Sequence, residues 1–157
     1  MDSYFKIFSS PNTKKNIIRS IYLAVNLTTF SHCFSEYGLQ LVECVGPSME
    51  PTILSSNVVI CEHITPIFRR PTYGDIVIAK SVSDPLVNVC KRVTGIAGDI
   101  IWTGCKFTRV PQGHVWLQGD NSSESTDSRV YGPVPEALIR GRVSLRIWPL
   151  REMCVFW

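Results

Sequence analysis

The sequence has few of the residues that build metal sites. Its 157 residues include six cysteines, none in a C-x-x-C pair, and three histidines that are not placed to complete a zinc site with them. Structural zinc sites usually pair their ligands at such short spacings. We therefore expect no metal, no cofactor and no disulfide framework, and we predict buried thiols, with a single bridge left open.

Runs of like charge are also missing. The 16 basic and 13 acidic residues give a net charge of +3 and are scattered along the chain. Binding to a phosphate backbone needs clustered Lys and Arg side chains, so nucleic acid is not an expected partner. The chain also lacks internal repeats and low-complexity segments, and its length suits one domain with an appendage.

No apolar run reaches the roughly 20 residues that a membrane-spanning helix prefers. The uncharged block at residues 20–35 is shorter and follows a basic flank, which consists of Lys6, Lys14, Lys15 and Arg19. This order is typical of an uncleaved anchor whose basic end stays on the more negative side, although a packed amphipathic helix is the alternative. We predict a basic flank and membrane anchor over residues 1–40, with lipid contact through residues 20–35.

Short β-branched runs, broken by Gly, Pro, Asn and Asp, begin at about Leu41. Such runs are typical of strands, and the intervening residues suit chain reversals. The predicted strands are residues 41–45, 57–64, 75–81, 86–96, 99–104, 114–119 and 141–149. The pattern predicts a mostly β domain over residues 41–157, built as a small barrel behind the helical anchor.

The segment ECVGPSMEPT, residues 43–52, places Ser48 between two prolines. A serine hydroxyl is a poor nucleophile until a base accepts its proton. His63 and His114 lie in strand-like runs without an acidic partner at a motif-like spacing, so a Ser-His-Asp triad is only weakly indicated. A lysine is the more promising base.

Lys91 lies in VNVCKRV, where the period of two in a strand places it on one face with Val87, Val89 and Val93. If that face is buried, desolvation disfavours the ammonium form and lowers the lysine pKa toward the range useful for a general base. Lys80 fits a similar pattern, so spacing alone gives Lys91 only a small advantage.

Several segments, in this order, resemble the successive conserved boxes of the type I signal peptidase family. They are GPSMEPT (46–52), YGDIVIAK (73–80), CKRVTGIAGD (90–99) and GDNSSESTDSRVYGPVP (119–135). The resemblance implies a Ser-Lys serine endopeptidase on a mostly β fold that cleaves sorting signals from membrane-inserted precursor proteins. By position, Ser48 matches the nucleophile, Lys91 the general base, and Ser125 a hydroxyl that orients the lysine.

The same resemblance implies supporting roles around these residues. Met49 and Pro51 match structural positions beside the nucleophile, and Asp127 with Arg129 matches an ion pair. Gly46 departs from one bacterial branch, whose hydroxyl at this position helps to bind the oxyanion. The oxyanion is then expected to depend on backbone N–H groups, chiefly that of Ser48.

Within the family, the segments IAKSVSDP, GHVWLQGDN, STDSR, YGPVP and LIRGRVSLRIWPL resemble a branch of the mitochondrial inner membrane. Relatives of the endoplasmic reticulum replace the lysine with histidine, and a glycan on the sequon at Asn121 would obstruct a substrate. We therefore expect a domain facing the intermembrane space and a homologous second subunit. A bacterial-type leader peptidase, an inactive β-barrel partner and a self-cleaving repressor-type protease are the alternatives.

Overall fold

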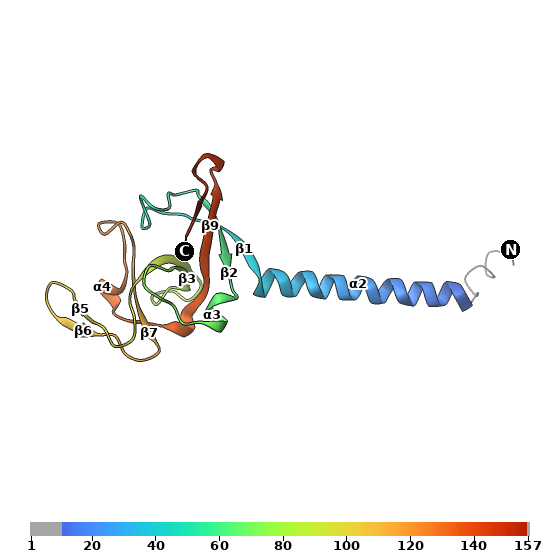
Figure 1. Cartoon of the computed structure of the whole chain (residues 1–157), viewed down its shortest axis with the longest axis horizontal. Coiled ribbons are helices and arrows are strands. Elements are labelled where there is room, and N and C mark those ends of the chain that lie inside the picture. Colours follow the sequence, from blue (N-terminus) through green and yellow to red (C-terminus); the bar gives the residue numbers. More distant parts are fainter. Residues whose placement is uncertain (1–10, 157) are drawn as a thin grey trace. The chain divides into compact units, whose positions relative to one another are not determined.

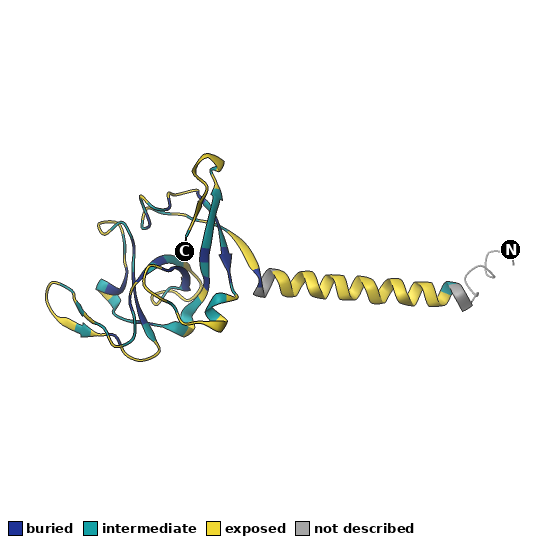
Figure 2. Ribbon diagram, in the orientation of Figure 1, coloured by how far each residue is buried: buried dark blue, intermediate teal, exposed yellow. Residues whose placement is uncertain are grey.

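The computed structural model describes residues 11–156, so the basic flank at Lys6 lies outside the described residues. The chain divides into two compact units, one ending at Glu36 and the other beginning at Tyr37. The first contains α2 (Pro11–Tyr37) up to Glu36, and the side chains of this helix are exposed along residues 14–34 (Figures 1 and 2). Within residues 11–156, no helix combines the length and the apolar character that a membrane span requires.

The second unit is mostly β, as the sequence predicts (Figure 1). Its strands are β1 (Leu39–Glu43), β2 (Val58–Glu62), β3 (Ile76–Lys80), β4 (Asn88–Gly95), β5 (Ile100–Trp102), β6 (Phe107–Arg109), β7 (His114–Gln118), β8 (Val134–Pro135), β9 (Ile139–Trp148) and β10 (Cys154–Val155). The short helices are α3 (Thr65–Phe68), α4 (Ser128–Tyr131), η1 (Glu136–Leu138) and η2 (Leu150–Glu152). Every predicted strand is present, with shifted ends. The prediction omitted β6, β8 and β10, which are too short to show a period of two.

The main sheet has the strand order β1-β2-β9-β3-β4-β7-β8, and β10 pairs with β9 beside this path. Strands β5 and β6 form a separate hairpin. Strand β9 is long enough to pair with β2, β3 and β10. It therefore joins the β1 and β2 end of the main sheet to the end that begins with β3. Among the described strands no ladder joins β1 to β8, so the sheet is open at these edges.

Strand β3 is covered on both faces and separates two apolar clusters, in agreement with its dark colour in Figure 2. Ile76 and Ile78 belong to the first cluster, and Val77 and Ala79 belong to the second. Neighbouring β4 follows the same alternation, with Cys90 packed on the first cluster and Val93 within the second. Burial of both faces makes the centre of the domain a place where a charged side chain is strongly disfavoured.

The cysteines are only partly as predicted. All six are free, and Cys61 is fully buried while Cys44 and Cys90 are half-buried. The prediction of buried thiols is wrong for Cys33, Cys105 and Cys154, which are exposed. Cys33 is on α2, Cys105 is in the turn between β5 and β6, and Cys154 begins β10. These positions have too little chain packed over them to cover a side chain.

Candidate active site

Ser48 lies in the loop between β1 and β2 and is half-buried. The loop is fixed by its apolar residues, because Met49 and Ile53 are buried in the first cluster and the Ile53 N–H donates to the Met49 carbonyl at 2.9 Å. A hydrogen bond from the Glu50 N–H to the Pro47 carbonyl, 3.1 Å long, closes a turn that contains Ser48. The buried Met49 side chain therefore fixes the position of the loop beside Ser48. Pro51 follows in the same turn region and is exposed.

Lys91 is buried in β4, with only 4% of its surface exposed. It pairs with Val77 of β3 and shares a face with Val89 and Val93, which pack in the second cluster. On this face Lys91 and Val93 are buried and Val89 is half-buried, whereas Val87, which precedes the strand, is 49% exposed. The opposite face of β4 is also partly covered, which sequence periodicity did not indicate.

The Lys91 amine is hydrogen-bonded to the Ser125 hydroxyl, with Nζ 2.9 Å from Oγ. Burial lowers the pKa of Lys91 below its ordinary value, and the charge of Arg129 acts in the same direction. The negative charge of Asp127 opposes this shift, and so does the interaction with the Cys90 side chain. Desolvation is the dominant cause, so the site favours the neutral amine that a general base requires.

Asp127 is fully buried, with 0% exposure, and holds the other side of Ser125. Its Oδ2 accepts from Ser125 Oγ at 2.8 Å and from the Gly119 N–H at 2.9 Å. Arg129 donates to both carboxylate oxygens, from Nε at 2.8 Å and from Nη2 at 2.7 Å. Burial alone would raise the pKa of Asp127, but these bonds lower it to about 2. The carboxylate therefore stays ionised and accepts the hydrogen bonds that order the loop.

Gly119 lies in the candidate site, although the sequence pattern did not single it out. A Cβ atom built there would lie 2.3 Å from Ser125 Oγ and 2.4 Å from the carbonyl oxygen of Ser48. The same Ser48 carbonyl accepts from the Asn121 N–H at 3.1 Å. Only glycine lets the loop that carries Ser125 approach the loop that carries Ser48 so closely. The glycine in the GDN segment was the available signal.

A second ion pair ties the same region to β4. Arg92 donates to both oxygens of Asp120, from Nε at 2.8 Å and from Nη2 at 2.7 Å. Its Nη1 also donates to the Gly74 carbonyl at 2.9 Å. This bidentate pair joins the residue after Lys91 to the residue after Gly119. The sequence reasoning missed it, because the partners are 28 positions apart.

Ser48 and Lys91 line one cavity of about 230 Å³. Its wall is largely apolar and includes Val42, Ile78 and Val89. Ser125 and Asp127 do not line it, so they support the amine without facing this cavity. The structure thus places the candidate nucleophile and base at one hollow with room for a side chain of a peptide.

The alternative bases lie elsewhere. The Nδ1 atom of His63 is 2.7 Å from the Arg140 carbonyl, and that of His114 is 3.1 Å from the Gln112 carbonyl. Lys80 donates from Nζ to the Pro85 carbonyl at 2.9 Å. None of these side chains lines the cavity that contains Ser48. Among residues 11–156 no group of three or more His, Cys, Asp or Glu side chains could hold a metal ion.

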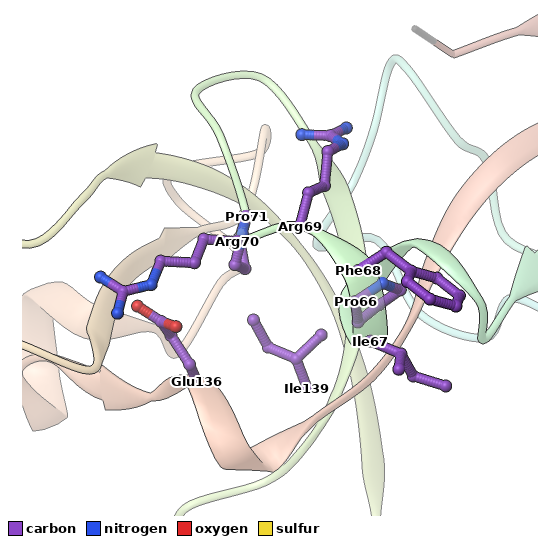
Figure 3. Close-up of a pocket in the computed structure, with 8 residues that line it drawn as sticks. All are labelled: Pro66, Ile67, Phe68, Arg69, Arg70, Pro71, Glu136 and Ile139. Atoms are coloured by element: carbon purple, nitrogen blue, oxygen red, sulfur yellow. The ribbon is translucent and has the colours of Figure 1, made fainter.

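A different cavity, of about 170 Å³, lies beside α3 (Figure 3). Ile139 lies between the α3 side and Glu136, and the Arg70 guanidinium points toward Glu136. The other lining residues are Pro66, Ile67, Phe68, Arg69 and Pro71. No Ser, Thr, Cys or Lys side chain lines this cavity, so it does not offer the serine and lysine chemistry of the first cavity.

Comparison with known proteins identifies the family of the chain. The model of the family "Signal peptidase, peptidase S26" matches residues 14–104 and 101–148. The chain is 52% identical to mitochondrial inner membrane protease subunit 1 of Xenopus tropicalis over 128 residues, which cover 78% of this chain and 77% of that protein. It is 40% identical to mitochondrial inner membrane protease subunit 2 of Danio rerio over 112 residues, which cover 66% of this chain and 61% of that protein.

Among solved structures, a signal peptidase I from Enterococcus faecalis matches with a TM-score of 0.42 and 20% identity. The match covers 48% of this chain and 98% of that one. The sequence matches confirm the predicted family and activity, and they favour similarity to subunit 1 over subunit 2. With the family model spanning most of its length, the chain belongs to the signal peptidase family, peptidase S26, and is a mitochondrial serine peptidase that removes signal peptides.

Proposed function

We propose that this peptidase works with a Ser48-Lys91 dyad and cleaves sorting signals from precursor proteins delivered to the mitochondrial intermembrane space. One observation carries the proposal: the buried Lys91 amine, hydrogen-bonded to Ser125, lines the same cavity as Ser48. Serine, lysine and an uncharged orienting hydroxyl together have the chemistry that acyl transfer needs.

The hydrogen-bond directions leave the amine free to act. Ionised Asp127 can only accept, so the Ser125 hydroxyl proton is donated to it. The Ser125 oxygen must then accept from an N–H of Lys91. A neutral lysine amine keeps one lone pair, and this arrangement leaves that lone pair available for the Ser48 hydroxyl. An aspartate in place of Ser125 would instead favour the ammonium form.

The reaction then has two halves. Lys91 Nζ accepts the Ser48 hydroxyl proton as Ser48 Oγ attacks the scissile carbonyl, and the resulting ammonium gives that proton to the leaving amine. An ester to Ser48 remains. Lys91 next accepts a proton from water, the hydroxide attacks the ester, and return of the proton to Ser48 Oγ releases the new carboxyl end.

Oxyanion stabilisation has to come from backbone donors. Gly46 has no side chain to contribute, and its φ of +98° shapes the turn that presents Ser48. The Ser48 N–H is the donor that we assign, and losing one such donor typically costs about 10²–10³ in rate.

The apolar wall at Val42, Ile78 and Val89 suits an uncharged side chain beside the scissile bond.

Partner and membrane contacts follow as parts of the same proposal. The relatives named subunit 1 and subunit 2 support a homologous second subunit for this chain.

Helix α2 exposes large apolar side chains, among them Ile18, Leu27 and Phe30, which need a cover such as lipid or another protein. We infer lipid contact through residues 20–35. Extraction of isolated membranes with alkaline carbonate should leave the chain in the pellet, and recovery in the soluble fraction would contradict this contact.

The deciding experiment incubates the purified full chain with intermembrane-space precursors and follows cleavage on a gel, with and without the homologous subunit. Wild-type protein should release the signal peptide, and Ser48→Ala should not. If the Ser48→Ala variant restores cleavage by the other subunit as well as wild type does, the chain is the inactive partner of the alternative hypothesis.

A further inference from the structure

Two thiols line the cavity that contains Ser48. Cys44 follows the end of β1, four positions before Ser48, and Cys90 directly precedes Lys91 in β4. Both side chains pack on the first apolar cluster and both line the cavity. Each thiol shifts the pKa of the other, so the two side chains lie close enough to interact. Two neighbouring thiols in the wall of this cavity are not needed for the serine and lysine chemistry.

The two thiols differ in reactivity. The hydrogen bond from Cys90 lowers the pKa of Cys44 despite its burial, and the same bond raises the pKa of Cys90. Cys44 therefore carries the larger thiolate fraction, and the thiolate is the form that attacks disulfides. Cys61 is the third thiol of this cluster, but it is fully buried, and burial raises its pKa to about 12. Cys61 is thus expected to stay an inert thiol.

We propose that Cys44 and Cys90 form a reversible disulfide that closes the cavity to peptide, which makes this pair a redox-sensitive modification site beside Ser48 and Lys91. The effect on peptide cleavage rests on the proposed function, whereas formation of the disulfide does not. Both cysteines are half-buried and line an open hollow, so a small oxidant can reach them.

The oxidant in this proposal is a low-molecular-weight disulfide such as oxidised glutathione. The Cys44 thiolate attacks one of its sulfurs, and the first glutathione thiolate leaves. Cys90 then loses its proton to solvent and attacks the Cys44 sulfur of the mixed disulfide, and the second glutathione thiolate leaves. The protein loses two electrons and two protons, and the oxidant is reduced to two thiols.

A bond at this place would join the two elements on which catalysis depends. A disulfide brings its sulfurs to about 2.05 Å, closer than hydrogen-bonded thiols. It would tie the segment leading into the Ser48 loop to β4, which carries Lys91. The two sulfurs would occupy the wall of a cavity of only about 230 Å³, so a small inward movement removes room for a substrate side chain.

The test treats the full-length protein with oxidised glutathione, blocks the remaining thiols, and maps disulfides by mass spectrometry. A Cys44–Cys90 linkage is expected, reversed by dithiothreitol. Peptide cleavage should fall to the level of the Ser48→Ala variant on oxidation and return on reduction. A linkage from Cys44 to Cys61, or no linkage under conditions that oxidise exposed cysteines, would overturn the proposal.

Matched variants keep the proposal separate from the proposed function. Cys105→Ser with Cys154→Ser removes two exposed thiols outside the cavity, and this variant should still form the linkage and lose activity. Cys44→Ser and Cys90→Ser, each compared with its own reduced activity, should be insensitive to oxidation. Ser48→Ala should form the disulfide normally, because the linkage does not need the nucleophile. If the wild type forms the linkage but shows no peptidase activity when reduced, only the proposed function is rejected. Sensitivity that persists in Cys90→Ser would reject the disulfide.

Discussion

Lys91 Nζ lies 2.9 Å from Ser125 Oγ, although the two residues are 34 positions apart. Strand β4 supplies the lysine, and the loop between β7 and α4 supplies the serine. Gly119 allows that loop to approach Ser48. Asp127 accepts a hydrogen bond from the Ser125 hydroxyl on the side away from Lys91. The contact gives the buried amine of Lys91 a hydrogen-bond partner and fixes its position, as the proposed general base requires.

Lys91→Arg separates a base from a mere positive charge. The arginine guanidinium is not deprotonated in proteins, so it cannot accept the Ser48 proton. We expect Lys91→Arg to lose cleavage as completely as Lys91→Ala, measured on a precursor peptide after circular dichroism has confirmed the fold. Lys80→Ala is the matched control and should keep most activity, because Lys80 does not line the cavity. Substantial activity in Lys91→Arg would contradict a lysine base.

The pH dependence of cleavage should reflect the lowered pKa of Lys91. Only the neutral amine is a base, so kcat/KM should rise with pH through that pKa and level off before the ordinary value of 10.5. The profile is measured on purified wild type over the range in which the fold is intact. A rise centred at the ordinary lysine value would mean that burial does not tune this amine.

Ser125→Ala should lower kcat more than it raises KM, because Ser125 positions the base and does not line the substrate cavity. General-base catalysis contributes about 10²–10⁴-fold, and poor positioning should lose part of that factor. Ser125→Thr keeps the hydroxyl and should recover activity relative to alanine, which a purely structural role would not require. Steady-state kinetics on all three proteins decide the matter, and equal kcat values would assign the loop to surface structure.

Gly119→Ala should disrupt the contact between the Ser48 loop and the loop that carries Ser125. Its Cβ atom would meet Ser125 Oγ at 2.3 Å and the Ser48 carbonyl at 2.4 Å, and the second neighbour is backbone that cannot rotate away. Overpacking of this kind typically costs about 1–3 kcal/mol of folding stability. The cleavage rate should fall by more than the reduced fraction of folded protein explains. Ser122→Ala, at an exposed position of the same loop, is the control for urea unfolding and for activity. A fully active Gly119→Ala variant would refute the close approach.

Asp127 should contribute to acid unfolding. Its pKa falls from 3.8 to about 2 in the folded state, so its stabilisation is complete above pH 3.8 and is lost as the pH falls toward 2. The shift corresponds to about 2 kcal/mol at most. Urea unfolding of wild type and Asp127→Asn at pH 5 and pH 2.5 measures this, and their difference in stability should shrink at the lower pH. A pH-independent difference would show that the carboxylate charge is not what stabilises the loop.

The candidate dyad illustrates what local sequence can indicate. Period-two patterning placed Lys91 on one face with Val87, Val89 and Val93, and Val89 and Val93 do pack in the second cluster, whereas Val87 is exposed. The same pattern fitted Lys80 almost as well, because periodicity reports a face and not its neighbours. Only the family resemblance of the ordered segments selected Lys91, and its catalytic role remains a proposal.

Sequence by itself determined the mostly β class, the places of the longer strands and the family, because alternating β-branched runs and ordered motifs are properties of contiguous residues. The tertiary structure alone decided the rest. It covered both faces of β3, brought Gly119 against Ser48, paired Arg92 with Asp120 and placed the Cys44 and Cys90 thiols in one cavity. These relationships join residues far apart in the chain, and they depend on strand order and register, which no local pattern of side chains specifies.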